Sequence, residues 1–278
     1  MFPLIAAISQ AAGIIVDKIV LTRRRVEVHV FIPALFMFLM LLTALLVPSL
    51  GKVSPEFVSL KYIGIFFAML FTAVIWNVFY YRGIQKEKVQ ELELIMMFQP
   101  LFTIFLAAVL IEQNINAHIF IASIIAAVAL IAAHLRKMHF QFTEYTSGLI
   151  LAVVFMSVEI ILQKILLEVF SPVALYFTRT LMLFLFFYFY YRPRMEKISS
   201  ANTWLILTSS ALGVVQMVTK FYGFESYGVI YTSLVLILAP VLVYLLSKVT
   251  LHEKLKARTV ICAVVILGCI VYATLLGK

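Results

Sequence analysis

The sequence contains little charge and little cysteine. Only 13% of its 278 residues are charged, whereas about a quarter is usual in a soluble domain. Because 64% of the residues are hydrophobic, the chain cannot be a soluble globular protein or a disordered chain. Cys262 and Cys269 lie seven residues apart in one apolar run, or about 10 Å along a helix, which is too far for a disulfide. The bilayer is the remaining solvent.

Motifs for nucleotide and metal chemistry are also absent. The sequence has no GxxxxGK[ST] segment, which excludes a P-loop ATPase, and no His, Cys and Asp cluster with metal-ligand spacing. We therefore expect no metal and no other cofactor. The alternative of an integral-membrane enzyme acting on lipids would need reactive polar groups clustered at one interface. We do not expect an enzyme, because the histidines scatter over both predicted membrane faces, at His29, His118, His134, His139 and His252.

Ten apolar runs, separated by short polar segments, make up the chain. They are continuous rather than alternating, and about twice the length of a barrel strand, so they predict transmembrane helices. The expected fold is an all-α integral membrane protein with ten spans, at residues 3–22, 30–50, 60–81, 92–111, 117–135, 148–167, 172–191, 204–224, 227–247 and 257–276.

The distribution of lysine and arginine predicts the orientation of the chain. Fifteen of these residues lie in the gaps after odd-numbered spans, and three lie on the other side, namely Lys52, Lys61 and Lys278. Because cytoplasmic loops carry the excess of Lys and Arg, both termini are expected outside the cytoplasm. The net charge of +9 then reflects topology in a cytoplasmic membrane, and we expect the lipid bilayer, not nucleic acid, as a partner.

The two halves of the sequence resemble each other. The segment VFIPA at 30–34 matches VFSPV at 169–173, and further pairs recur at corresponding places, namely Lys18 and Lys164, Gly83 and Gly223, and Pro100 and Pro240. Five spans per half is an odd number, so the second half must enter the membrane from the opposite side. The sequence therefore predicts two inverted five-helix repeats, at residues 1–140 and 141–278, as in many secondary transporters.

Each half carries a Lys late in its first span and a Pro followed by a Glu around its fourth. The second of these patterns ends at Glu112 and Glu253. This arrangement resembles the EamA-type branch of the drug/metabolite transporter superfamily over essentially the whole chain, although Ala12-Gly13 replaces the Trp-Gly pair often seen in the first helix. The resemblance implies a carrier of small metabolites, coupled to a gradient or working by exchange.

Six charged residues fall inside the predicted spans beyond the first two residues of each span, namely Asp17, Lys18, Glu159, Lys164, Arg179 and Lys220. Such residues are costly in a bilayer and need a partner, a cavity or a substrate. Glu159 and Arg179 lie on consecutive antiparallel helices at depths that differ by roughly 5 Å, which an Arg side chain can bridge. The pair is either a structural ion pair or a site in which Arg179 binds a substrate carboxylate or phosphate and Glu159 orients it or takes a proton.

Other polar side chains are expected to line a central cavity. Lys164 lies near Arg179 in depth, and Gln216 with Lys220 forms a polar stripe on the eighth span. The corresponding residues of the first half are Trp76, Asn77, Tyr80, Gln10 and Gln99. The alternatives are snorkelling of the lysines to the interface and hydrogen bonding between packed helices. Pro100 and Pro240 are expected as paired mid-helix kinks beside this site, where a gate could bend, or as simple helix-shaping residues.

These patterns predict a secondary transporter of a small anionic or zwitterionic organic metabolite, working by alternating access. Glu159 is the expected carboxylate if transport is coupled to protons. A multidrug exporter of lipophilic cations is the alternative, but related small pumps carry a Glu eight residues before the late Lys, where this chain has Gln10 and Met156. Small residues at Ala122, Ala126 and Ala129 permit close helix contacts, within the monomer or in a homodimer.

Overall fold

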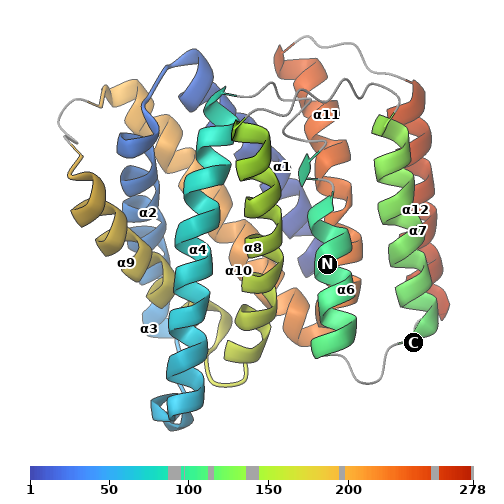
Figure 1. Ribbon diagram of the computed structural model, residues 1–278, viewed down its shortest axis with the longest axis horizontal. Helices are drawn as coiled ribbons and strands as arrows, with labels where there is room; N and C mark the ends of the chain where they lie inside the picture. The colour runs from blue at the N-terminus through green and yellow to red at the C-terminus, as the bar shows by residue number, and fades with distance from the viewer. Residues whose placement is uncertain are drawn as a thin grey trace.

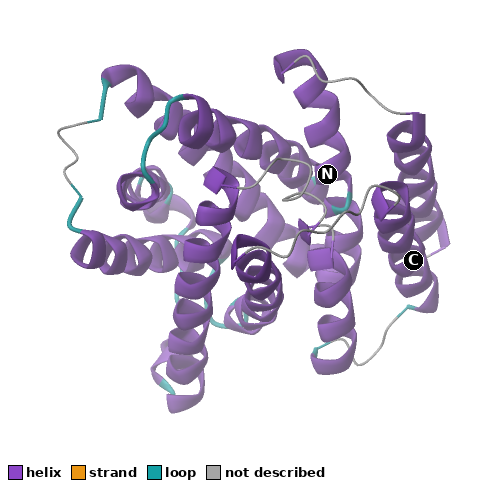
Figure 2. Ribbon diagram, turned by 45° about the horizontal axis from the view of Figure 1, so that its top comes forward, coloured by secondary structure: helices purple, strands orange, loops and turns teal. Residues whose placement is uncertain are grey.

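The computed structural model describes residues 1–86, 95–96, 98–111, 116–135, 144–193, 198–251 and 257–276. These residues are almost entirely helical (Figure 2), and among them the only strand-like pairing is an isolated bridge between Val53 and Phe170. The expected all-α architecture is confirmed. Glu112 and Glu253 lie outside the described residues.

The elements of the first half are α1 (Phe2–Lys18), η1 (Ile19–Arg23, a π-helix), α2 (Val28–Ala44), α3 (Val47–Leu50), η2 (Pro55–Val58), α4 (Leu60–Lys86), α6 (Phe98–Leu110) and α7 (Ala117–Leu135). Those of the second half are α8 (Glu144–Leu166), α9 (Pro172–Tyr191), α10 (Ser200–Leu236), α11 (Leu238–Leu251) and α12 (Ala257–Leu276).

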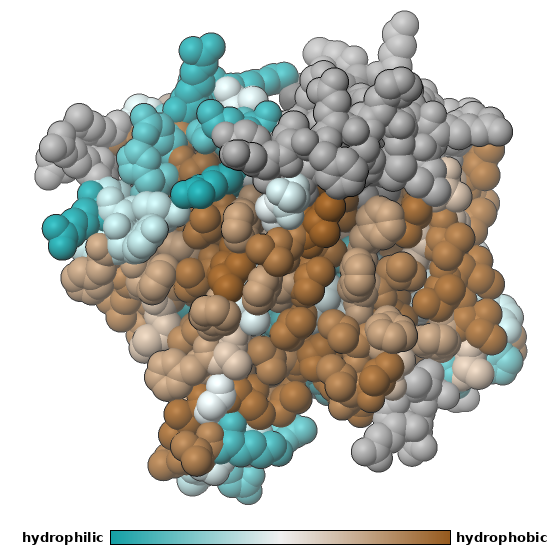
Figure 3. Space-filling view, in the orientation of Figure 1, coloured by the Kyte–Doolittle hydropathy of each residue, from teal (hydrophilic) through white to brown (hydrophobic). Residues whose placement is uncertain are grey.

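The surface of the molecule suits a bilayer. In Figure 3 a broad apolar band crosses the middle of the visible face, with hydrophilic side chains gathered above and below it. Large rings such as Phe67, Phe71 and Phe105 are at least 60% exposed on this surface, where water would be an unfavourable neighbour. Among the described residues, five helices are long and apolar enough to cross a membrane, and four shorter helices are also apolar. The number of ten spans therefore stays a prediction.

One of these five candidates is a segment of 44 residues, Ser200–Val243, and it is not a single straight helix. Gly228 has φ 79° and ψ 170°, a conformation that is open almost only to glycine. A methyl group on Gly223 would lie 3.0 Å from Thr232 Cγ2, whereas nine residues along a straight helix span about 13 Å. The chain therefore reverses at Gly228, close to the predicted break between residues 224 and 227.

Pro240 lies just after an interruption of its helix. It is the third residue of α11, which follows α10 after a single turn residue, Ile237. Ile237 keeps right-handed helical dihedral angles, φ −58° and ψ −20°. A proline lacks the N–H that a helix interior needs and clashes with the preceding turn, so it kinks or breaks a helix. Pro100 lies in α6, and residue 97, just before that helix, is outside the described residues, so the kink expected at Pro100 stays a prediction.

Helices of the first half pack most extensively on helices of the second half. The main pairs are α1 with α10, α4 with α8, α2 with α9, and α7 with α12. Figure 1 shows α4 beside α8 near the centre and α7 beside α12 at the right edge. Gly83 permits one of these close approaches, because a methyl group there would lie 2.4 Å from the side chain of Leu149 on α8.

Two loops from different halves are joined by hydrogen bonds. Ser54 N donates to Val169 O (2.7 Å), and Ser171 N donates to Lys52 O (2.9 Å). The hydroxyl of Ser171 donates to Leu50 O (2.8 Å). Ser171 is also the N-cap of α9, ahead of a proline at the first helical position, as expected for a helix start. The connection after α2 is thereby fixed to the connection between α8 and α9.

Candidate functional site

A cavity of about 180 Å³ lies between the two halves. Each of the main helices around it contributes residues spaced three, four and seven apart, which is the spacing of one helix face. From α1 and α8 these residues are Gln10, Gly13, Ile14, Asp17, Met156, Glu159, Ile160 and Gln163. From α4 and α10 they are Trp76, Asn77, Tyr80, Tyr81, Ser209, Gly213, Gln216, Met217 and Lys220.

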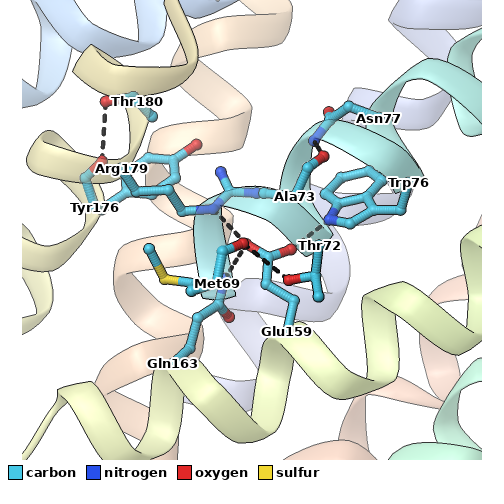
Figure 4. A network of polar contacts seen from close by, with 10 residues as sticks. All are labelled: Met69, Thr72, Ala73, Trp76, Asn77, Glu159, Gln163, Tyr176, Arg179 and Thr180. Atoms are coloured by element: carbon cyan, nitrogen blue, oxygen red, sulfur yellow. Dashed lines mark hydrogen bonds and ion pairs between the residues drawn. The ribbon is translucent and has the colours of Figure 1, made fainter. Parts of the chain in front are cut away.

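Glu159 is the centre of a hydrogen-bond network on the cavity wall (Figure 4). Arg179 Nε contacts Glu159 Oε1 at 2.6 Å as an ion pair, and Gln163 Nε2 donates to the same oxygen at 2.8 Å. The indole N–H of Trp76 donates to Glu159 Oε2. Both charged side chains are 3–4% exposed. Three donors thus satisfy this carboxylate, and the guanidinium also lies 5.9 Å from the Trp76 ring centroid.

Lys220 is the second cation of the cavity wall and has a different environment. The residue is only 8% exposed. Its ammonium group lies 5.8 Å and 5.7 Å from the ring centroids of Phe221 and Phe224. The part of the chain that the structure describes offers it no hydrogen bond and no ion pair. A buried ammonium without an anion is costly, so Lys220 is suited to receive an anionic group that enters the cavity.

Asp17 supplies the second carboxylate of the cavity wall. It is 7% exposed, and the hydroxyl of Ser209 donates to its Oδ1. Asp17, Glu159, Arg179 and Lys220 are the charged residues that line the cavity, so its formal charge is zero when all four are ionised.

Lys18 and Lys164 lie apart from this cavity, although Lys164 was expected to support Arg179. Lys164 Nζ donates to Phe224 O (2.8 Å), and Lys18 Nζ donates to Ile84 O (2.7 Å). Both carbonyls belong to the last turn of a helix, one before the reversal at Gly228 and one near the end of α4, where carbonyls lack helical partners and cations are favoured. These two lysines therefore bind carbonyl groups at helix ends.

The other expected site residues lie together. Arg179, Glu159, Gln216 and Lys220 line the cavity with Trp76, Asn77, Tyr80, Gln10, Gln99, Pro100 and Pro240. Gln99 Nε2 donates to Thr103 Oγ1 at 3.0 Å, and Asn77 Nδ2 donates to Ala73 O at 2.7 Å. The Oδ1 atom of Asn77 is buried without a hydrogen-bond partner among the described residues, so it can accept a bond from a ligand.

The sequence analysis did not assign several lining residues, namely Asp17, Gln163, Tyr81, Tyr176 and Ser209. Helical spacing could have found most of them. Gln163 follows Glu159 by four residues, Tyr176 precedes Arg179 by three, and Asp17 follows Gln10 by seven. Residues at these spacings share one helix face.

The described residues contain no group of three or more His, Cys, Asp or Glu side chains that could hold a metal ion.

The family comparison decides the identity of the fold, because the model of the EamA-like transporter family matches residues 1–133 and 146–275. The chain belongs to the EamA-like transporter family. It is a multi-pass membrane transporter of the drug/metabolite transporter superfamily, as the resemblance in the sequence implied.

The comparison with solved structures supports the fold and says nothing of the substrate. A crystal structure of another protein matches this EamA-like chain with a TM-score of 0.71 over 98% of this chain and 97% of its own length. The two sequences are 16% identical, so the match supports a shared helical architecture and no shared substrate. No curated protein matches the sequence.

Proposed function

We propose that this EamA-like transporter is a secondary carrier of a small metabolite that bears a carboxylate, anionic or zwitterionic, with a zwitterion favoured. Transport proceeds by alternating access to the central cavity. The observation that carries the proposal is the ammonium group of Lys220, which is buried at the cavity without a hydrogen bond or an ion pair among the described residues. A substrate carboxylate would supply a directly bound anion in a charge-assisted hydrogen bond.

The balance of charge and polarity in the cavity supports a zwitterionic solute. Two anions and two cations line it, so a solute with one charge of each sign leaves the site neutral, whereas a dianion or a lipophilic cation does not. The free Oδ1 of Asn77 can accept from a substrate amino group. Aromatic and methionine side chains, including Trp76, Tyr80 and Met156, also line the cavity and suit an apolar substrate side chain.

The pattern of helix packing supports two inverted repeats that move against each other. α1 packs on α10 and α11, and α8 packs on α4 and α6. When the two halves are exchanged, α8 takes the place of α1, and α4 and α6 take the places of the corresponding parts of α10 and α11. A two-fold relation between five-helix halves predicts this correspondence, with the binding site between them. Ten spans and rocking of one half against the other follow from the proposal.

A ligand-screened thermal unfolding experiment on purified protein tests the substrate class. The probes are the twenty L-amino acids, small mono- and dicarboxylates, and tetraphenylphosphonium as a lipophilic cation. A ligand at a hundred times its dissociation constant adds about 2.7 kcal/mol to the stability of the folded state. We expect amino acids with apolar side chains, such as L-methionine, to raise the unfolding temperature. Stabilisation by tetraphenylphosphonium alone would instead support the multidrug alternative.

A matched pair of lysine variants tests the assigned anion-binding group. Lys220→Met removes the cavity ammonium, and Lys61→Met removes an exposed lysine at the start of α4. A hydrogen bond to a charged group contributes about 1.5–3 kcal/mol, so Lys220→Met should weaken L-methionine binding by roughly tenfold or more. Lys61→Met should bind as the parent protein does. Equal binding by both variants would remove the basis of the proposal.

A further inference from the structure

Asp17 occupies an unusual position in both the sequence and the cavity. It is the only aspartate among the 13 acidic residues of the chain. Its side chain is buried at the cavity wall. A buried carboxylate in an apolar membrane protein marks a functional group by default, because its burial is costly.

The two carboxylates of the cavity differ in their hydrogen-bond donors. Glu159 receives Arg179, Gln163 and Trp76, and one of these is a permanent cation. Among the described residues Asp17 receives only the neutral hydroxyl of Ser209. A proton on Glu159 would have to displace the guanidinium or an N–H donor. A proton on Asp17 displaces no cation, so Asp17 is the carboxylate that can gain and lose a proton at small structural cost.

Few other charged or titratable groups face Asp17. From α4, Tyr81 lies close enough for its hydroxyl to feel the charge of Asp17 and of Arg179. On α10, Lys220 lies eleven residues beyond Ser209, or roughly 16 Å along the helix. Arg179 is held by Glu159.

The remaining elements around Asp17 contribute no facing charge within the described side chains. On α1 itself, Lys18 is directed to the carbonyl of Ile84. In η1, Arg23 is exposed. The described side chains of α11 that pack against this part of α1 and η1 are apolar, namely Leu242, Val243 and Leu246.

We propose that Asp17 is the proton-binding carboxylate of the transport cycle, while Glu159 stays ionised in its ion pair. The proposal rests on the proposed transport function. An oxygen of the Asp17 carboxylate takes a proton from a hydronium ion in the cavity to form a carboxylic acid and water, and the acid returns that proton to a water molecule when the cavity opens to the other side. This replaces the expectation that Glu159 is the coupling group.

The position of Ser209 explains how proton binding would be linked to movement. Asp17 belongs to α1 in the first half, and Ser209 belongs to α10 in the second half. A displacement of one half against the other changes their hydrogen bond and so changes the affinity of Asp17 for a proton. By thermodynamic linkage, protonation then favours one arrangement of the halves over the other.

Because Asp17 is the only aspartate, labelling can follow it without any mutation. The full chain is made by cell-free synthesis with aspartate labelled with ¹³C at the side-chain carboxyl, and it is studied in lipid nanodiscs by infrared spectroscopy between about pH 5 and pH 9. An exposed aspartate stays ionised throughout this range. We expect the labelled band to change from carboxylic acid to carboxylate within it. A labelled band that keeps one form throughout would overturn the proposal.

Two further measurements separate this proposal from its alternatives. In Glu159→Gln the labelled band of Asp17 should still change with pH. If this pH-dependent change disappeared in the variant, the proton would belong to the ion pair, which would contradict the proposal. Addition of L-methionine should shift the pH at which the band changes. L-methionine that stabilises the protein without shifting this transition would show that Asp17 is uncoupled. A failure of L-methionine to stabilise bears on the proposed substrate, because the titration of Asp17 needs no substrate.

Discussion

A buried ion pair such as Glu159 with Arg179 can serve structure or binding. Pairing repays the desolvation of both charges only when further hydrogen bonds satisfy the remaining atoms. Here Gln163 and Trp76 supply such bonds to the carboxylate. Both residues of the pair line the cavity, so a merely structural role and a substrate-binding role need a direct comparison.

Neutral variants of the pair make that comparison. Arg179→Ala leaves the charge of Glu159 buried and unpaired, which costs about 3–5 kcal/mol of stability, and we expect it to abolish L-methionine uptake while the protein still reaches the membrane. The double variant Glu159→Gln with Arg179→Gln removes both charges and should regain much of the lost unfolding temperature without regaining uptake. Normal uptake by the double variant would make the pair purely structural.

The sequence could predict which charged residues lie inside the membrane-spanning runs, but it could not predict the partner of each one. Charge inside an apolar run is visible in sequence, and it identified Glu159, Arg179 and Lys220. Lys164 is also a charge inside an apolar run, but its ammonium group donates to the carbonyl of Phe224, just before the reversal at Gly228. Such a partner depends on the tertiary path of another helix, which no local pattern contains. Asp17 was visible in the same way, but its role depends on Ser209 from the other half.

Among the helices, the reversal within α10 depends on one residue. Gly228 adopts φ 79° and ψ 170°, and it lets Gly223 and Thr232 come together. This conformation costs other residues about 1–3 kcal/mol. The carbonyl of Phe224 before the reversal accepts a hydrogen bond from Lys164, so a glycine and a lysine from separate helices build this corner together.

Gly228→Ala therefore tests the corner, with Gly64→Ala as its control. Gly64 lies within α4, and a methyl group there would meet no atom within 4 Å. We expect Gly228→Ala to lose about 1–3 kcal/mol and Gly64→Ala to keep or gain stability, because alanine favours helix over glycine. Unfolding temperatures in detergent provide the measurement. Equal unfolding temperatures for Gly228→Ala and the parent would contradict the argument.

The helices also show why their type was easier to predict than their breaks. Long apolar runs predicted the long helices that the structure describes, since a bilayer leaves the backbone no other partner, whereas the short helix at Pro55–Val58 lies outside those runs. Pro240 was visible in the sequence, but the place of the interruption, at Ile237 three residues before it, was not. The kink expected at Pro100 stays a prediction, because residue 97 is outside the described residues. The π-helix at Ile19–Arg23 had no signal in the sequence pattern.

At the scale of the whole molecule, the orientation of the chain can be tested directly. The ratio of fifteen to three Lys and Arg residues predicts that both termini lie outside the cytoplasm. Epitope tags fused to either end should therefore bind antibody on intact spheroplasts. A tag that becomes accessible only after the membrane is permeabilised would reverse the assigned sides. A tag inserted beside Arg24, in the first predicted cytoplasmic loop, is the control, and it should bind antibody only after the membrane is permeabilised.

The pairing of helices across the halves has a consequence for biosynthesis. α1, α2, α4 and α7 have their largest partners among α10, α9, α8 and α12, which leave the ribosome later. The first half must therefore wait in the membrane with its packing faces against lipid or unrelated helices until the second half is made. Packing between the halves can begin only when α8 arrives, and the described lining of the cavity is complete only when α11 has followed, so the binding site does not exist until most of the second half has been made.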